Sequence, residues 1–227
     1  MPTAATDDRR RRARAQRLRG LYAVTPEVMD TDDLVARVEA ALAGGASAIQ
    51  YRNKAADPTQ RRTQATALAR VLALRGGLYI VNDDAALAAA VGADGVHLGE
   101  DDGSIAAARE LLGPERIIGI SCYDDFERAR AGVAAGADYV AFGSFFASTV
   151  KPGARRADVA LLGRAEALGV PVVAIGGITA ENATELQRAG AHAVAVISAV
   201  FDATDVETAA RALASQWQQP SSSMHRT

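Results

Sequence analysis

Two cations and an amide alternate along one short stretch of the chain, Gln50-Tyr51-Arg52-Asn53-Lys54. An apolar run leads into it and is typical of the start of a buried strand. Because side chains in a strand alternate between faces, Gln50, Arg52 and Lys54 are expected to point the same way. An amide, a guanidinium and an ammonium on one spot suit an anion with several oxygens, such as a phosphate or diphosphate. The stretch predicts an anion site, with a solvated strand end as the simpler alternative.

Acidic side chains follow two further apolar runs of the sequence. Two acidic groups at neighbouring strand ends can share a Mg²⁺ ion, which prefers one or two carboxylates with water and substrate phosphates as its other ligands. The alternative is helix capping, because both clusters precede predicted helices. We predict that at least one Asp binds metal and that capping explains some of the other carboxylates. The two clusters are Asn82-Asp83-Asp84 and Glu100-Asp101-Asp102.

Few side chains near these clusters could act as a general base. His97 lies inside a predicted strand and is interpreted as a packed, hydrogen-bonded core residue. Ser121 ends another strand and could either donate to a substrate oxygen or cap the next helix. Cys122 has no activating partner in the sequence and is expected to be inert. The shortage of bases counts against a proton-abstracting isomerase.

A long loop and a glycine-rich turn follow two later strands. The loop at 143–153 mixes aromatic residues, hydroxyls and Lys151, which suits a partly mobile loop over a flat phosphorylated ligand; an ordinary surface loop is the alternative. Gly176-Gly177 would let the backbone approach an anion, with donors from the following helix N-terminus. Together with the end of the last strand, near Ser198, the turn predicts a second anion site. One diphosphate and one monophosphate ligand would fit the two sites.

These side chains need a scaffold that brings successive strand ends together. Short apolar strands alternate with amphipathic helical segments, and Gly-Ala pairs end a helix about every 50 residues, before every second strand. Four such βαβα quarters predict an α/β fold, a single (β/α)8 TIM barrel, with its active site at the C-terminal ends of the strands. A doubly wound open sheet is the alternative. The strands are expected at 21–26, 46–52, 77–82, 94–99, 117–121, 138–143, 171–176 and 192–198.

The composition restricts the classes of partner. The chain has 227 residues, 49% of them apolar, and a formal net charge of −2, so nothing global favours nucleic acid or an anionic membrane. A single cysteine excludes an intramolecular disulfide. No run has the length of a membrane span, and no signal-peptide core follows the basic start. We therefore expect a cytoplasmic protein that acts on small molecules and binds neither nucleic acid nor membrane.

Three regions are predicted along the chain. Residues 1–19 form an Arg-rich arm, interpreted as a frayed, solvated arm or a short helix. Residues 20–218 form the catalytic barrel. Residues 219–227 are polar and Ser-rich and are expected to be disordered.

Taken together, these residues resemble the thiamine phosphate synthase family. The resemblance covers about residues 18–215. It implies a (β/α)8 barrel and a transferase that condenses 4-amino-2-methyl-5-hydroxymethylpyrimidine diphosphate with 4-methyl-5-(2-phosphoethyl)thiazole, giving thiamine phosphate and diphosphate. The positions that carry it are Gln50, Arg52 and Lys54; Asn82 and Asp83; Gly95, His97, Gly99 and Asp102; Ser121; Lys151; Gly176-Gly177-Ile178; and Ile197-Ser198.

The resemblance also implies a role for each of these side chains. Asp83 and Asp102 would bind Mg²⁺. The catalytic contacts with the departing diphosphate would come from Arg52, Lys54, Ser121 and Lys151. The substrate-binding residues would be Gln50, Tyr51, Arg52, Asn53, Lys54, Asn82, Ser121 and Lys151 around the pyrimidine diphosphate, and Ser148, Thr149, Val150, Gly177, Ile197 and Ser198 around the thiazole phosphate.

Three positions depart from the family pattern. Glu100 stands where an amide is usual, Val150 replaces a frequent Thr, and Tyr123 replaces a frequent His. A thiazole tautomerase of the same superfamily is one alternative function, and it would be expected to use the base that Tyr123 replaces. A non-catalytic barrel that binds a phosphorylated ligand is the other.

Overall fold

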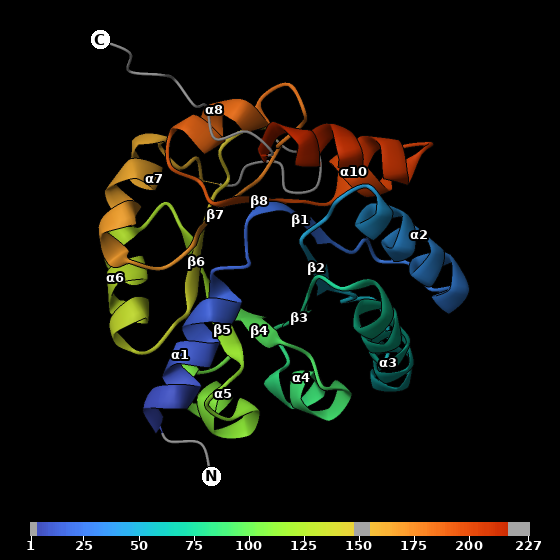
Figure 1. Cartoon of the computed structure of the whole chain (residues 1–227), viewed down its shortest axis with the longest axis horizontal. Helices are drawn as coiled ribbons and strands as arrows, with labels where there is room; N and C mark the ends of the chain where they lie inside the picture. The colour runs from blue at the N-terminus through green and yellow to red at the C-terminus, as the bar shows by residue number, and fades with distance from the viewer. Residues whose placement is uncertain (1–3, 148–154, 218–227) are drawn as a thin grey trace.

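The computed structural model describes residues 4–147 and 155–217. Eight parallel strands pair in chain order, and β1 also pairs with β8, so the sheet closes into a barrel with helices around it (Figure 1). This confirms the predicted (β/α)8 barrel over the open sheet. The strands are β1 (Gly20–Val24), β2 (Ala48–Tyr51), β3 (Leu78–Asn82), β4 (Gly95–Leu98), β5 (Ile117–Tyr123), β6 (Tyr139–Phe142), β7 (Val172–Ile175) and β8 (Ala193–Val196).

Each expected strand is found, and β5 runs two residues beyond its predicted end at Ser121, with a register shift between Ser121 and Tyr123. Helices connect the strands. They are α1 (Ala4–Ala15), α2 (Thr31–Ala43), α3 (Pro58–Arg75), α4 (Ala85–Val91), α5 (Ile105–Leu112), α6 (Phe126–Ala134), α7 (Ala160–Ala165), α8 (Ala183–Arg188), α9 (Ser198–Phe201) and α10 (Val206–Ala214), with 3₁₀ turns η1 (Glu166–Leu168) and η2 (Ser215–Trp217).

The strands divide the core into two layers. One set of side chains faces outward and packs against the helices, as Ile49 and Tyr51 of β2 do. The other set fills the barrel interior, as Ala48 of the same strand does. Because side chains alternate along a strand, residues two apart from Ala48 also point inward. This alternation determines which polar residues reach the interior and the strand ends.

The Arg-rich arm forms the short helix α1, one of the two forms expected for it, and this helix is docked on the barrel and not free in solvent. Leu18, just after α1, is fully buried and belongs to the cluster inside the barrel. Arg11 Nε donates to the buried Asp138 carboxylate at 2.8 Å, and Arg109 Nη2 binds the other oxygen of that carboxylate at 2.7 Å. Asp138 immediately precedes β6, so α1 lies at the end of the barrel where the strands begin, beside β5 (Figure 1). The composition of the arm indicated charge, but it did not reveal the buried partner.

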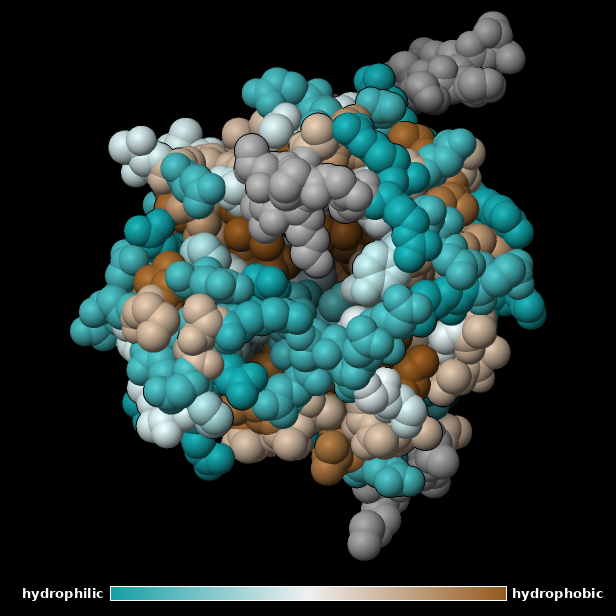
Figure 2. Space-filling view, turned by 180° about the vertical axis from the view of Figure 1, so that it is seen from behind, coloured by the Kyte–Doolittle hydropathy of each residue, from teal (hydrophilic) through white to brown (hydrophobic). Residues whose placement is uncertain are grey.

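The opposite end of the barrel faces the viewer in Figure 2. Polar side chains gather there around a hollow at the centre of the face. This is the end where the strands finish, because α1 lies at the other one (Figure 1). None of the helices among the described residues combines the length and apolar character that crossing a bilayer requires.

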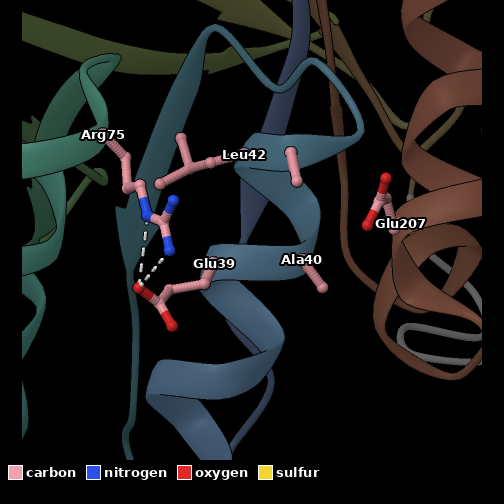
Figure 3. A pocket seen from close by; sticks show the side chains of 6 residues that line it. Glu39, Ala40, Leu42, Arg75 and Glu207 are labelled. Atoms are coloured by element: carbon pink, nitrogen blue, oxygen red, sulfur yellow. Dashed lines mark hydrogen bonds and ion pairs between the residues drawn. The ribbon is translucent and has the colours of Figure 1, made fainter.

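A separate cavity of about 320 Å³ lies outside the barrel, between α2, the end of α3 and α10 (Figure 3). Across it, Arg75 pairs with Glu39 at 3.2 Å, and both side chains are exposed. Leu42 supplies part of the apolar wall, and Glu207 faces it from α10. No strand contributes a lining residue, so this cavity is a gap in the outer helical layer and does not belong to the predicted site.

Candidate active site

The predicted anion-binding stretch lies where β2 ends. Gln50 pairs in register with Val24 of β1 and points into the barrel, where its side chain is 5% exposed. Arg52 follows two residues later, just beyond the last strand residue. Thr25 holds this turn, because its hydroxyl accepts from the Arg52 N–H at 2.9 Å and donates to the Arg52 carbonyl at 3.0 Å. The Arg52 backbone is therefore fixed at the strand end by a buried residue.

Each of the two cations in this stretch already has a carboxylate partner. Arg52 Nη1 donates to Glu27 at 2.9 Å, and Lys54 Nζ lies 2.8 Å from Asp83. An anionic ligand would exchange with these carboxylates rather than meet bare cations. The contact between Lys54 and Asp83 brings the strand-2 cations and the strand-3 acids together, as the sequence predicted.

The carboxyl groups of Asp83 and Asp102 lie next to each other in this site. Burial raises the pKa of Asp83, and the neighbouring Asp102 carboxyl raises it further, while Lys54 lowers it. The net direction is upward, so the charged form of Asp83 is disfavoured in the free protein. Asp83 also has a φ of 64°, a left-handed conformation that non-glycine residues seldom adopt. A strained residue with a disfavoured charge in a cleft is typical of a functional position.

Helix capping accounts for only part of the acidic clusters. Asp84 caps α4 by accepting from the Leu87 N–H at 2.8 Å. Asp102 does not cap α5, whose N-cap is Ser104; it accepts from the Gly99 N–H at 2.8 Å and stays at the end of β4. Neither predicted metal ligand, Asp83 or Asp102, is therefore a helix cap.

Two adjacent carboxylates fit a Mg²⁺ ion. Within residues 4–147 and 155–217, no group of three or more His, Cys, Asp or Glu side chains could hold a metal. A site of two carboxylates suits Mg²⁺ better than Zn²⁺, because Mg²⁺ keeps waters and takes substrate phosphate oxygens as its remaining ligands. Asp83 and Asp102 would hold the ion, and Lys54 would have to leave Asp83 when it bound.

His97 and Ser121 form a further part of the site inside the barrel. His97 Nε2 lies 2.9 Å from Ser121 Oγ, and the ring is buried. Burial lowers the pKa of His97 to about 4, so the imidazole is neutral at pH 7. Ser121 does not cap α6, since Asp125 does, which removes the capping alternative for Ser121. Cys122 belongs to the core cluster between the strands and the helices, and burial raises the pKa of its thiol to about 12, which accords with an inert role.

Tyr51 and Asn53 do not join this cluster. Both side chains are buried, and each hydrogen-bonds Gln64 of α3, Tyr51 through its hydroxyl at 2.9 Å and Asn53 through Nδ2 at 3.1 Å. Strand alternation explains the difference, because these two residues face outward while their neighbours face the site. The structure thus places these two predicted substrate-binding residues with their side chains against α3 and away from the cluster. Asn82, by contrast, pairs in register with His97 and lies beside the cluster.

The second predicted anion site lies across the same end of the barrel. Ile175 pairs in register with Ala195, so the glycine turn after β7 neighbours Ile197 and Ser198 after β8. Gly177 has a φ of 64°, and a Cβ there would fall 2.8 Å from the Phe146 Cβ. The glycine therefore accommodates the first part of the loop after β6. The predicted residues Ser148, Thr149, Val150 and Lys151 lie outside the described part of the chain.

Two of the departures from the family pattern can be located. Glu100 is exposed, and its carboxylate lies 3.8 Å from Arg128 Nη1. Arg128 also donates to the Ser121 carbonyl at 2.7 Å, so this α6 side chain ties the ends of β4 and β5 together. Tyr123 is 36% exposed, and its carbonyl accepts from the Gly143 N–H. The additional carboxylate of Glu100 is thus paired with the Arg128 guanidinium.

Sequence reasoning missed several residues that shape this site. Thr25 and Glu27 follow β1 and contact Arg52, yet nothing in their own spacing indicated it. Tyr22 and Tyr139 lie inside the barrel, where the alternation of β1 and β6 could have placed them. Arg128 is one of several arginines on the helices, and no sequence signal separates it from the others.

Known proteins resemble this chain in both sequence and structure. The family model described as thiamine monophosphate synthase matches residues 21–200. A thiamine-phosphate synthase from Thiobacillus denitrificans is 58% identical over 195 residues, which are 86% of this chain and 92% of that protein. A thiamine-phosphate synthase from Chromobacterium violaceum is 57% identical over 198 residues, covering 87% and 96%.

The structural likeness extends to a solved thiamine phosphate pyrophosphorylase from Pyrococcus furiosus. It superposes with a TM-score of 0.80 at 37% sequence identity, over 90% of this chain and 96% of that one. Both likenesses span nearly the whole barrel, and the relatives carry the name expected from the motifs. The resemblance seen in the sequence is confirmed: the chain belongs to the thiamine monophosphate synthase family.

Proposed function

We propose that this chain condenses 4-amino-2-methyl-5-hydroxymethylpyrimidine diphosphate with 4-methyl-5-(2-phosphoethyl)thiazole, forming thiamine phosphate and releasing diphosphate. One observation carries the proposal beyond family membership. The cations after β2 and the paired carboxylates after β3 and β4 meet through the 2.8 Å contact between Lys54 and Asp83. The cations suit a ligand with several negative charges, and the carboxylates suit a divalent metal ion bound together with that ligand.

The departing diphosphate is assigned to the end of β2. Arg52 and Lys54 would exchange Glu27 and Asp83 for phosphate oxygens, and the guanidinium can bind two oxygens at once. Asn82, Ser121 and Lys151, with Gln50, would complete the contacts to this substrate. Cations fixed in advance stabilise negative charge as it develops on the leaving group.

The metal proposal concerns Asp83 and Asp102. A bound Mg²⁺ would supply further positive charge against the oxygens of the diphosphate. Asp83 gains from such a partner, because burial and Asp102 disfavour its charge in the free protein. Asp102 is already oriented by the Gly99 N–H. Both carboxylates would therefore be placed before either substrate binds.

The thiazole phosphate is assigned to the ends of β7 and β8. Gly177, Ile197 and Ser198 neighbour one another there, and the proposed contacts also include Ser148, Thr149 and Val150. The two substrates would then meet over the centre of the barrel face. No strong protein base is needed, because the thiazole nitrogen itself attacks the pyrimidine methylene carbon as diphosphate leaves. A neutral His97 accords with that requirement.

The test is an incubation of the purified chain with both substrates and Mg²⁺, followed by detection of thiamine phosphate. Arg52→Ala and Asp83→Asn are expected to lower product formation by at least about 100-fold, as losses of transition-state charge stabilisation do. Asn suits the left-handed backbone at position 83, so this variant tests the charge and not the backbone. Arg130→Ala is the matched control, because Arg130 is exposed on α6 and, among the described residues, pairs only with its helical neighbour Glu127. Full activity in both site variants would refute the assigned roles.

The alternative functions give different results in the same assay. A thiazole tautomerase would convert the thiazole tautomer alone and would not need the pyrimidine diphosphate. A non-catalytic barrel would bind the phosphorylated ligands without turnover. Neither is favoured by the site. A tautomerase leaves the cations Arg52 and Lys54 without a diphosphate to bind, and a barrel that only binds ligands has no need of a site for a leaving group.

A further inference from the structure

Five polar side chains form a continuous line across the barrel interior. Gln50 Nε2 lies 2.7 Å from the Tyr22 hydroxyl, which lies 3.0 Å from the Tyr139 hydroxyl. The Tyr139 hydroxyl lies 3.0 Å from His97 Nδ1, and His97 Nε2 lies 2.9 Å from Ser121 Oγ. The line starts at one proposed substrate contact, Gln50, and ends at another, Ser121.

The three middle residues of this line, Tyr22, Tyr139 and His97, are unusually polar for the interior of a barrel. The interior of this fold is normally filled with branched apolar side chains. Tyr22 and Tyr139 are at most 1% exposed, and His97 is 8% exposed. Polar groups buried so deeply cost stability unless each is hydrogen-bonded, and here each one is.

The line has a direction that follows from counting donors. A tyrosine hydroxyl has one hydrogen, and an amide nitrogen can only donate. Gln50 Nε2 donates to Tyr22, so the arrangement that uses the Tyr22 hydrogen within the line sends it to Tyr139. In that arrangement Tyr139 donates to His97 Nδ1, which leaves the imidazole proton on Nε2. His97 Nε2–H therefore donates to Ser121.

We propose that Gln50, Tyr22, Tyr139 and His97 form a one-way hydrogen-bond chain that presents the Ser121 hydroxyl to the substrate as a hydrogen-bond donor. Ser121 accepts from His97, so its own hydrogen is left for a partner in the hollow. Tyr22, Tyr139 and His97 are positioning residues, because they act on the reaction only through Ser121. This proposal rests on the proposed function, in which Ser121 contacts the pyrimidine diphosphate.

The packing supports a fixed geometry for this chain. The Tyr139 ring stacks on the His97 ring with centroids 5.5 Å apart. Gly119 faces the Tyr139 ring, and any Cβ at that position would overlap it. The ring of Tyr139 thus fills the space that a side chain at position 119 would take. This packing holds the Tyr139 hydroxyl next to His97 Nδ1. The His97 carbonyl also accepts from the Asp83 N–H at 2.8 Å, so the histidine is anchored on its backbone side.

The opposite direction would give Ser121 a different role. If His97 carried its proton on Nδ1, Ser121 would donate to Nε2 and resemble a nucleophile next to a base. The two cases differ in the histidine tautomer, in the orientation of the Gln50 amide and in the direction of the hydroxyl hydrogens between them. A direct observation of the tautomer therefore separates them.

The first experiment uses long-range ¹H–¹⁵N correlation spectra of the ¹⁵N-labelled full chain without substrate, with His97 assigned by the loss of its signals in His97→Gln. We expect a single tautomer with protonated Nε2 and unprotonated Nδ1. Tyr139→Phe should convert it into a mixture of tautomers. Tyr79→Phe is the matched control, because the buried Tyr79 hydroxyl donates to the Ala65 carbonyl outside the barrel interior. An Nδ1–H tautomer in the unmodified chain would overturn the proposal.

The second experiment is a double-mutant cycle on the condensation reaction. Tyr139→Phe is expected to lower kcat about tenfold with little change in KM, which is the effect of one hydrogen bond lost. In a Ser121→Ala background the same substitution should have no further effect, because it acts through Ser121. Tyr22→Phe should behave like Tyr139→Phe and serves if that variant folds poorly.

The outcomes distinguish the chain from a structural role and from a failure of the proposed function. Independent losses in the cycle, or a kcat in Tyr139→Phe equal to that of Tyr79→Phe, would contradict the positioning role. Absence of any condensation by the unmodified chain would refute the proposed function, while the tautomer measurement would still decide the direction of the hydrogen bonds.

Discussion

The docking of α1 leads to a test that compares two neighbouring arginines. Arg11 and Arg12 lie side by side on α1, and each pairs with Asp8. Only Arg11 also reaches Asp138, the buried carboxylate at the start of β6. We therefore compare Arg11→Ala with Arg12→Ala, since both remove one arginine from the same helix and differ in the buried contact.

The expected magnitude follows from the partners of Asp138. A hydrogen bond between charged groups with a buried partner contributes about 1.5–3 kcal/mol. Asp138 keeps Arg109 Nη2 and the Ile118 N–H when Arg11 is lost, so it is not left without partners. Arg11→Ala should therefore lower the free energy of unfolding by about 2 kcal/mol, near the lower end of that range. Arg12 is 77% exposed, and such surface pairs contribute less than about 1 kcal/mol.

The assay is urea unfolding of both variants and the unmodified chain, followed by fluorescence or circular dichroism at pH 7. Arg11→Ala should shift the midpoint to lower urea with an unchanged slope, and Arg12→Ala should leave it nearly in place. Equal and small shifts in the two variants would mean that α1 is a solvated arm, and would refute the docking.

Three further predictions concern the site. Asp83→Asn should stabilise the free protein at pH 7 in thermal unfolding while it abolishes condensation, because the raised pKa of Asp83 means that its charge opposes folding; a lower Tm would contradict this. Burial keeps His97 neutral with a pKa of about 4, whereas the unfolded chain binds the proton near 6.5, so stability should fall as the pH drops below 6.5. Between about pH 7.5 and pH 5 that loss amounts to roughly 2 kcal/mol and should be absent in His97→Gln. Gly177→Ala should destabilise the protein more than Gly92→Ala in urea unfolding, because both have positive φ but only position 177 lacks room for a Cβ; equal effects would contradict the packing.

Much of the fold follows from local pattern. The Gly-Ala repeat and the apolar runs predicted all the strands, because short parallel strands are buried on both sides and a glycine caps the C-terminus of α2, α3, α4 and α5. The end of β5 was missed, since its last residues lie at a register shift that periodicity does not encode. The docking of α1 was missed as well, because a run of arginines looks the same in sequence whether or not one of them meets a buried carboxylate.

The site could be predicted where residues share a face of one strand, as Gln50, Arg52 and Lys54 do. The same alternation should have removed Tyr51 and Asn53, whose side chains lie against α3. Contacts between strands that are distant in sequence could not be predicted. Tyr22 lies on β1 and Tyr139 on β6, far apart in the sequence. Their hydroxyls come within hydrogen-bond distance only when the barrel closes.

The central claim is that the cations after β2 and the paired acids bind a departing diphosphate. The most direct measurement is the amount of both products formed from the two substrates by the purified full-length chain, before and after removal of Mg²⁺ with a chelator. The account predicts equal amounts of thiamine phosphate and diphosphate, no reaction after chelation, and recovery when Mg²⁺ is restored. Product formation that is insensitive to chelation, or diphosphate released without thiamine phosphate, would contradict it.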